Sequence, residues 1–510
     1  MPLLVAVSRA NRLRQGYGGP PKLYAKAEAG HHEAGDRTAH GRSIRPFLLG
    51  VTTGFVYFSG TLYWLTGVMQ TYGGLNLLAA LGTQVLLILY LAAFPALFAW
   101  MAAVLIAGYG MTGLLLTPAA WVLTELGRTH LFGGFPWVLL GYSQATNLPV
   151  AQIASVLGVF GVSALVALVN AALGAVVLSQ GRGARTWPAI TAAAVLIAST
   201  GWGYWRIRDA RLVHEGTPIR VALVQGNVAQ DDKWNPQLAP RILERYLSMT
   251  QQATRQGATL VIWPESATPF LYEDDPVGAR ALRALVRDAG VHLLFGSDQI
   301  ERDRPPRSYN AAFMLDPAGR TRGVYRKIHL VPFGEFVPLK RMLFFVKPLV
   351  EAISDFSPGT DTTMLSYEDH RISTAICYEV VYPRLIRQMV LSGSELLTTI
   401  TNDAWYGRSS APHQHFWQAA MRSIEEGRYL ARAANTGVSG IVDPYGRAVI
   451  RSELFVPDVL VGEVRLLAGR TPYARFGDLF AYLVSLLCAG AIALDWWLRR
   501  ASTARGWFQG

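Results

Sequence analysis

The sequence predicts a protein of two parts, an α-helical polytopic membrane domain and an α/β domain. Of its 510 residues, 51% are hydrophobic and only 16% are charged, which is typical of a chain that is partly embedded in a membrane. Residues 46–124 contain no Asp, Glu, Lys or Arg. Residues 215–470 instead alternate short β-branched segments with helix-like stretches, a rhythm typical of layered α/β packing.

The apolar runs are long enough to cross a bilayer several times. A helical span needs roughly 20 residues, so the uncharged stretch accommodates about three. We expect spans near residues 47–69, 76–98, 100–124, 150–178, 188–205 and 478–498. The expected domains are therefore a polar basic N-terminal segment (1–45), a transmembrane domain of about five spans (46–206), the α/β domain (215–470) and a C-terminal transmembrane helix (478–498).

The α/β domain is expected to contain strands and helices in alternation. Runs rich in Val, Ile and Leu, typical of buried strands, and longer stretches with a helical pattern follow one another along the chain. The expected strands are 219–224, 260–263, 292–295, 372–376 and 396–400, and the expected helices are 239–256, 277–289 and 412–432.

The distribution of Lys and Arg predicts the orientation. Residues 1–45 carry eight basic residues against three acidic ones, so the positive-inside rule predicts a cytoplasmic N-terminus. Five spans then place the α/β domain on the other side, and the sixth returns the chain to the cytoplasm, where Arg499 and Arg500 agree. Arg206 and Arg208 do not agree, unless they begin the globular domain, whose charges have little influence on orientation.

The net charge of +12 does not indicate nucleic-acid binding. The excess is spread over membrane flanks and tails, without a compact basic stripe interleaved with aromatic residues. The GxGxxG match at 108–113 lies within an apolar span, where close helix packing is expected in place of dinucleotide binding. His413 and His415 have no Cys or carboxylate partner at a metal-ligand spacing. We predict no metal and no cofactor.

Three residues of the α/β domain supply the parts of an acyl-transfer site. Cys377, which ends a strand-like segment, is a candidate nucleophile that would carry an acyl group as a thioester. Glu265 is the candidate base for the thiol proton, and Lys327 the candidate cation for the oxyanion. Taken singly, Cys377 also fits a core position, Glu265 a turn or helix cap, and Lys327 a solvated loop.

Long motifs around these residues follow a fixed order, namely Val224–Asn227, Trp263–Ser266, Lys327–Pro338, Cys377–Glu379 and Asn402–Gly407. From about residue 47 to 498, the chain resembles the bacterial apolipoprotein N-acyltransferases, which are nitrilase-superfamily enzymes of lipoprotein maturation. The resemblance implies a nitrilase-like αββα sandwich and places Glu265, Lys327 and Cys377 at the positions of the family's triad. The family usually begins with a further pair of spans, where this sequence has a polar segment of about 45 residues.

The resemblance also implies supporting residues. Glu335 and Glu379 would orient Lys327 or line the pocket, with structural salt bridges as the alternative. The weaker candidates for the pocket or a lid are Tyr378, Trp234, Asn402 and Trp405. In the loop 333–350, Leu343, Phe344 and Phe345 would either touch the bilayer or pack against the domain.

The function implied is the transfer of a fatty acyl group from a membrane phospholipid to the α-amino group of a diacylglyceryl-modified N-terminal cysteine of an apolipoprotein. The expected protein is a monomer in the bacterial inner membrane, with a periplasmic catalytic domain and cytoplasmic termini. Two alternatives remain open, a membrane-tethered nitrilase-like amidase that ends its reaction with water and a noncatalytic membrane scaffold.

Overall fold

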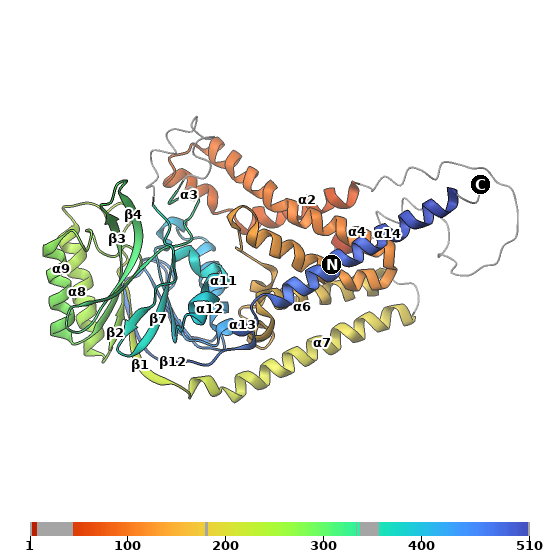
Figure 1. The fold of residues 1–510 in the computed structure, drawn as a ribbon. Helices are drawn as coiled ribbons and strands as arrows, with labels where there is room; N and C mark the ends of the chain where they lie inside the picture. Colours follow the sequence, from red (N-terminus) through yellow and green to blue (C-terminus); the bar gives the residue numbers. More distant parts are fainter. Residues whose placement is uncertain (1–2, 8–43, 179–181, 333, 337–355, 508–510) are drawn as a thin grey trace, which may run out of the picture.

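The computed structural model describes residues 3–7, 44–178, 182–332, 334–336 and 356–507. An α/β domain lies at one end of the molecule and a group of long helices at the other, as Figure 1 shows. The expectation for Leu343, Phe344 and Phe345, and nearly all of the polar N-terminal segment, lie outside the described residues.

In the described part of the chain, two six-stranded sheets form the centre of the α/β domain. The strands are β1 (Thr217–Gln225), β2 (Leu260–Ile262), β3 (His292–Glu301), β4 (Arg307–Leu315), β5 (Thr321–Arg326), β6 (Leu365–Tyr367), β7 (His370–Ile376), β8 (Leu396–Thr401), β9 (Leu430–Ala434), β10 (Gly440–Val442), β11 (Ala448–Arg451) and β12 (Asp458–Leu466). One sheet has the order β12-β1-β2-β3-β4-β5 and the other β11-β10-β9-β8-β7-β6. Parallel pairs at the centre of each sheet, such as β1 with β2 and β7 with β8, are joined by helical crossovers.

Helices cover the outer face of each sheet (Figure 1). They are α8 (Ala239–Arg255), α9 (Pro276–Ala289), α11 (Pro383–Leu391), α12 (Ala411–Glu426) and the short α13 (Pro472–Phe476). Ile242 of α8 and Leu282 of α9 share one core with Val261 of β2, whereas Leu385 of α11 packs in the core that contains Ile372 of β7. The layers are therefore helix, sheet, sheet and helix, and the predicted αββα sandwich is confirmed.

Strand β1 illustrates why these segments are apolar on both faces. Side chains alternate between the two faces of a strand. Val221 and Leu223 point into the core between the sheets, and Ala222 and Val224 point into the core beneath α8 and α9. A sheet that is covered on both faces requires such continuous apolar runs.

Helix ends follow local capping. The side chain of Asp275 accepts hydrogen bonds from Val277 N and Gly278 N at the start of α9, and Gly290 ends that helix with φ 65°. Helix α12 ends at Glu426 because Gly427 adopts a left-handed conformation. The predicted helix 412–432 therefore ran too far, into β9.

The second part of the protein consists of helices. They are α2 (Arg45–Thr61), α3 (Leu65–Thr71), α4 (Leu77–His130), α6 (Ala154–Leu178), α7 (Arg182–Asp209) and α14 (Leu479–Trp507), with the short α5 (Leu148–Ala151) before α6. Within the described residues, α4, α6 and α14 are each long and apolar enough to cross a membrane, and α2 with α3 forms a fourth candidate that is bent by 56°.

Helix α4 differs from the two separate spans that the sequence predicts in this region. The helix continues through residue 99, where a break was expected, and changes direction at Gly110, which has φ 58°. A Cβ atom on Gly113 would lie 1.9 Å from Leu105 O. Residues eight apart lie about 12 Å apart along a straight helix, so the chain folds back on itself here. The GxGxxG match thus marks a tight reversal between two helical segments.

Candidate active site

Each residue predicted for catalysis lies just beyond the end of a strand of the sandwich. Glu265 lies three residues beyond β2, Lys327 is the first residue after β5, and Cys377 is the first residue after β7. These strands belong to both sheets, β2 and β5 to one and β7 to the other. The three side chains are buried, which removes them from bulk water and strengthens the interactions between their charges.

The Glu265 carboxylate is held by neutral donors on both oxygens. Asn310 Nδ2 donates to Oε1 at 2.7 Å, and the main-chain N–H of Asn402 donates to Oε2 at 2.9 Å. Lys327 Nζ lies 3.6 Å from Oε1. The carboxylate is thus fixed in one orientation beside a cation.

The Lys327 ammonium lies between two carboxylates. Its Nζ donates to Glu335 Oε1 at 2.8 Å, in addition to its contact with Glu265. Burial lowers the pKa of Lys327, but the charges of Glu335 and Glu265 outweigh burial and raise the pKa above its ordinary value. Lys327 therefore remains a cation and cannot serve as a base. Asn310 Nδ2 also donates to Glu335 Oε1 at 2.9 Å, so one amide joins both carboxylates.

Cys377 begins a short 3-10 turn, η4 (Cys377–Val381), with φ 54°, a conformation that costs free energy for any residue other than glycine. Burial raises the pKa of the Cys377 thiol, the negative charge of Glu265 raises it further, and Lys327 lowers it. The resting residue is therefore a thiol, which needs a base before it can attack.

A buried network behind Cys377 holds its main chain. His415 Nε2 lies 3.1 Å from Cys377 O, and His415 Nδ1 lies 3.0 Å from Asp403 Oδ1. Arg432 Nη2 donates to Asp403 Oδ2 at 2.9 Å. Burial opposes the ionisation of Asp403, but Arg432 and His415 outweigh it and lower its pKa to about 2. A carbonyl oxygen only accepts hydrogen bonds. His415 therefore carries a proton on Nε2 and donates a hydrogen bond to the main-chain oxygen of Cys377.

Glu335 and Glu379 have different positions. Glu335 contacts the Lys327 ammonium, whereas Glu379 binds main chain on both sides of the site. Glu379 accepts hydrogen bonds from Ile376 N at 2.8 Å, Ile328 N at 2.7 Å and the Tyr325 hydroxyl at 2.9 Å. Burial raises the pKa of Glu379 to about 7. Glu379 therefore ties the end of β5 to the end of β7 and fixes the distance between the segments of Lys327 and Cys377.

The weaker candidates occupy three kinds of position. Asn402 was expected to line the pocket or a lid. It is buried, and its main-chain N–H donates directly to the Glu265 carboxylate. The buried Tyr378 ring stacks on Trp137 of the helical part with ring centres 5.9 Å apart. The rings of Trp234 and Trp405 are partly exposed, at 47% and 37%.

Sequence reasoning missed several members of this site. Asn310, Asp403 and Arg432 were not singled out, and His415 was considered only as a metal ligand. Asn310 could have been noticed because it is a strongly polar residue within the otherwise apolar run 309–315. The others bind one another across different elements, which no local spacing reveals.

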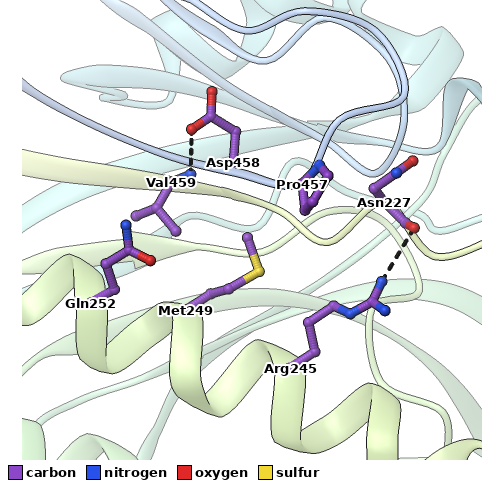
Figure 2. Close-up of a pocket in the computed structure, with 7 residues that line it drawn as sticks. All are labelled: Asn227, Arg245, Met249, Gln252, Pro457, Asp458 and Val459. Carbon is purple, nitrogen blue, oxygen red and sulfur yellow. Dashed lines mark hydrogen bonds between the residues drawn. The ribbon is translucent and has the colours of Figure 1, made fainter.

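A pocket of about 510 Å³ lies apart from the triad, at the edge of the sandwich between α8 and β12. Figure 2 shows its lining, which includes Arg245, Met249 and Asp458. The guanidinium of Arg245 donates to the main-chain oxygens of Gly226 and Asn227 at 2.9 and 3.3 Å. Arg245 thus fixes the start of the loop that follows β1.

Comparison with known proteins identifies the family. Residues 220–471 match the carbon-nitrogen hydrolase family, and residues 37–172 match the apolipoprotein N-acyltransferase N-terminal domain. An apolipoprotein N-acyltransferase of Geobacter metallireducens is 40% identical over 86% of this chain and 84% of the relative. The chain belongs to the apolipoprotein N-acyltransferase family. One of Methylococcus capsulatus is also 40% identical, over 90% of this chain and 88% of its own.

Membership confirms the predicted family and the predicted enzyme class, an acyltransferase of lipoprotein maturation. Among solved structures, an amidase from Nesterenkonia aligns with 50% of this chain and 93% of its own at 22% identity, with a TM-score of 0.39. The apolar helices and the family together indicate a membrane protein.

Proposed function

We propose that Cys377, Glu265 and Lys327 are the catalytic triad of an apolipoprotein N-acyltransferase that works through a thioester. The observation that carries this assignment is the buried pair of Glu265 and Lys327, whose charges act on a neutral thiol in a strained turn; Glu335 holds the Lys327 ammonium. A neutral thiol beside a carboxylate is the resting state that base-assisted attack requires.

In the first half-reaction, the Cys377 sulfur attacks the ester carbonyl of a membrane phospholipid while Glu265 accepts the thiol proton. The carbonyl π-bond pair moves to oxygen, and Lys327 stabilises the resulting oxyanion. The oxyanion then re-forms the carbonyl, the C–O ester bond breaks, and Glu265 returns the proton to the departing alkoxide. The products are an acyl-Cys377 thioester and a lysophospholipid.

In the second half-reaction, the free α-amine of a diacylglyceryl-modified N-terminal cysteine attacks the thioester. The new C–N bond forms as the C–S bond breaks, and Glu265 transfers a proton from the amine to the sulfur. Water competes for the same thioester, so the site must exclude it. The burial of Cys377 and the stacked Trp137 and Tyr378 rings beside it support such exclusion.

The proposed setting is the bacterial inner membrane, crossed several times, with the catalytic domain in the periplasm and both termini in the cytoplasm. The proposed acyl donor is a phospholipid, the acceptor is a diacylglyceryl-modified apolipoprotein, and the enzyme acts as a monomer without nucleic acid. The basic N-terminal segment and the Arg residues in the last part of α14 support this orientation.

Mass spectrometry of a reaction of the purified protein with phospholipid and a diacylglyceryl lipopeptide tests the proposal. We expect N-acylated peptide from the wild type and an acyl adduct on Cys377 when the peptide is omitted. Cys377→Ser should retain the fold and form no thioester. Free fatty acid in place of N-acyl peptide would indicate the amidase alternative, and an adduct on another residue would contradict the role of Cys377.

A further inference from the structure

A second buried lysine lies at the site, on the loop between β1 and α8 (226–238). Lys233 is 5% exposed, and its Nζ donates to the main-chain oxygen of Glu265 at 3.1 Å. Within the part of the chain that the structure describes, no carboxylate lies within ion-pair distance of this ammonium. A buried ammonium without a close counter-ion costs free energy.

Several contacts fix the loop that carries Lys233. At its start, Arg245 holds the main-chain oxygen of Gly226 and that of Asn227, the second of which Figure 2 shows. Next, Asn435 exchanges two hydrogen bonds with the main chain of Val228, at 2.9 and 2.8 Å. Further along, Asn402 Nδ2 donates to Gln230 Oε1 at 2.6 Å. Since Asn402 also binds the Glu265 carboxylate, the loop and the proposed base are held as one unit.

The charges of the site require a second cation. Glu265 and Glu335 share the single ammonium of Lys327, which leaves one negative charge without compensation. Asp298 of β3, which accepts a hydrogen bond from Ser266, adds a third carboxyl group, and burial raises its pKa to about 6. Burial lowers the pKa of Lys233, against the opposing effects of Glu265, Asp298 and Cys377. Burial raises the pKa of Tyr406, and the electrostatic effects of Cys377, Asp403 and Glu265 raise it further, so Tyr406 is a further titratable group of this site.

We propose that Lys233 is a positioning residue for the acyltransferase reaction. Its ammonium holds the Glu265 main chain through the carbonyl oxygen and balances the negative charge of the buried site. The inference rests on the proposed role of Glu265 as the base. Without the Lys233 cation, the negative charge of the buried carboxylates is no longer balanced, and the uptake of a proton by the site becomes more favourable.

The test is the pH dependence of the single-turnover formation of acyl-Cys377 from a bilayer phospholipid by the full-length protein. Lys233→Gln keeps a neutral hydrogen-bond donor but loses the charge. In this variant, the acidic limb of the pH–rate profile should move by about one pH unit to higher pH, as expected for the loss of one nearby charge. The rate on that limb should fall about tenfold. Lys233→Arg keeps the charge and should keep the limb of the wild type.

Asp232→Asn is the matched control, because Asp232 is an exposed residue of the same loop and its replacement also changes the charge by one. This variant should leave the limb in place. A Lys233→Gln enzyme with reduced rates but the acidic limb of the wild type would overturn the inference, because only the structural anchor would then matter. If Lys233→Gln does not fold, a shifted limb in Lys233→Arg would overturn it equally. A wild type without an acyl adduct on Cys377 would instead contradict the proposed function.

Discussion

Removing the Lys327 ammonium would distinguish an effect on the rate of thioester formation from an effect on phospholipid binding. The ammonium lies between Glu265 and Glu335 and is held there by both. A cation fixed before the reaction stabilises an oxyanion without reorganising, which is why such groups contribute strongly to the transition state and little to substrate binding.

We expect Lys327→Met to lower the rate of thioester formation by about 10²- to 10³-fold, the loss typical of a missing oxyanion donor. The side chain keeps most of its length, so the fold should persist. Stopped-time measurements of acyl-Cys377 at saturating phospholipid would give this rate. A reduced apparent affinity for the donor with an unchanged rate would assign Lys327 to binding.

The triad could be predicted from the sequence, but its environment could not. Glu265 and Cys377 each lie in a recognisable motif close to the end of a predicted strand, and Lys327 begins the motif Lys327–Pro338. Lys233 and Asn310 gain their importance from partners that lie 32 and 45 residues away in the chain. Such contacts arise from the stacking of strands and loops and leave no periodic signal in the sequence.

The β3 strand determines how closely the Glu265 segment can approach the sheet. Gly296 lies directly beneath this segment, and its main-chain N–H donates to Pro264 O at 3.2 Å. A Cβ atom at Gly296 would lie 2.5 Å from Ser266 N and 2.7 Å from Glu265 Cα. Both obstacles are main-chain atoms, so the segment that carries the proposed base would have to move.

Gly296→Ala should therefore lower the acylation rate by roughly 10²-fold, the effect expected of a 1 Å displacement of a catalytic group. The matched control is Gly290→Ala, at a position with φ 65° and no atom within 4 Å of an added Cβ. This change should cost about 1–2 kcal/mol of stability and leave the rate intact. Parallel thermal unfolding and acylation assays distinguish the two, and equal rates in both variants would contradict this account.

Element types were easier to predict than element ends. The apolar runs of β1, β2, β7 and β8 indicated strands because both faces of each sheet are covered. The end of α12 and the reversal within α4 depend instead on the left-handed conformations of Gly427 and Gly110. Glycine permits this conformation without requiring it, so tertiary packing decides which glycine ends or folds a helix.

The contact between the sandwich and the helical part contains buried carboxyl groups of α12. Glu425 Oε1 accepts a hydrogen bond from Val159 N of α6, and Arg422 lies 3.0 Å from the other Glu425 oxygen. The neighbouring Glu426 is fully buried, and neither of its carboxyl oxygens has a hydrogen-bond partner in the described part of the chain. Burial and the charge of Glu425 raise the pKa of Glu426 to about 8, despite Arg422, Arg428 and Arg387 nearby.

This raised pKa predicts a stability that falls with pH. The protonated Glu426 of the folded state contributes stability fully below the ordinary glutamate pKa, and the contribution is lost as pH rises toward 8. Glu426→Gln stays neutral, so its unfolding temperature should exceed that of the wild type by an amount that grows between pH 5 and pH 8.5. The exposed Glu244→Gln serves as control. A difference independent of pH would show that Glu426 does not change its protonation on unfolding.

The antiparallel pairing of β1 with β12 has a consequence for folding during the synthesis of the chain. Thr217 pairs with Leu466, so β1 lacks its outer neighbour until roughly 250 further residues have been made. An open strand edge is a template for wrong partners, and contacts so distant along the chain form slowly. Helix α14 begins at Leu479, soon after β12 ends. The sheet that contains β1 is therefore completed only shortly before the candidate span α14 is made.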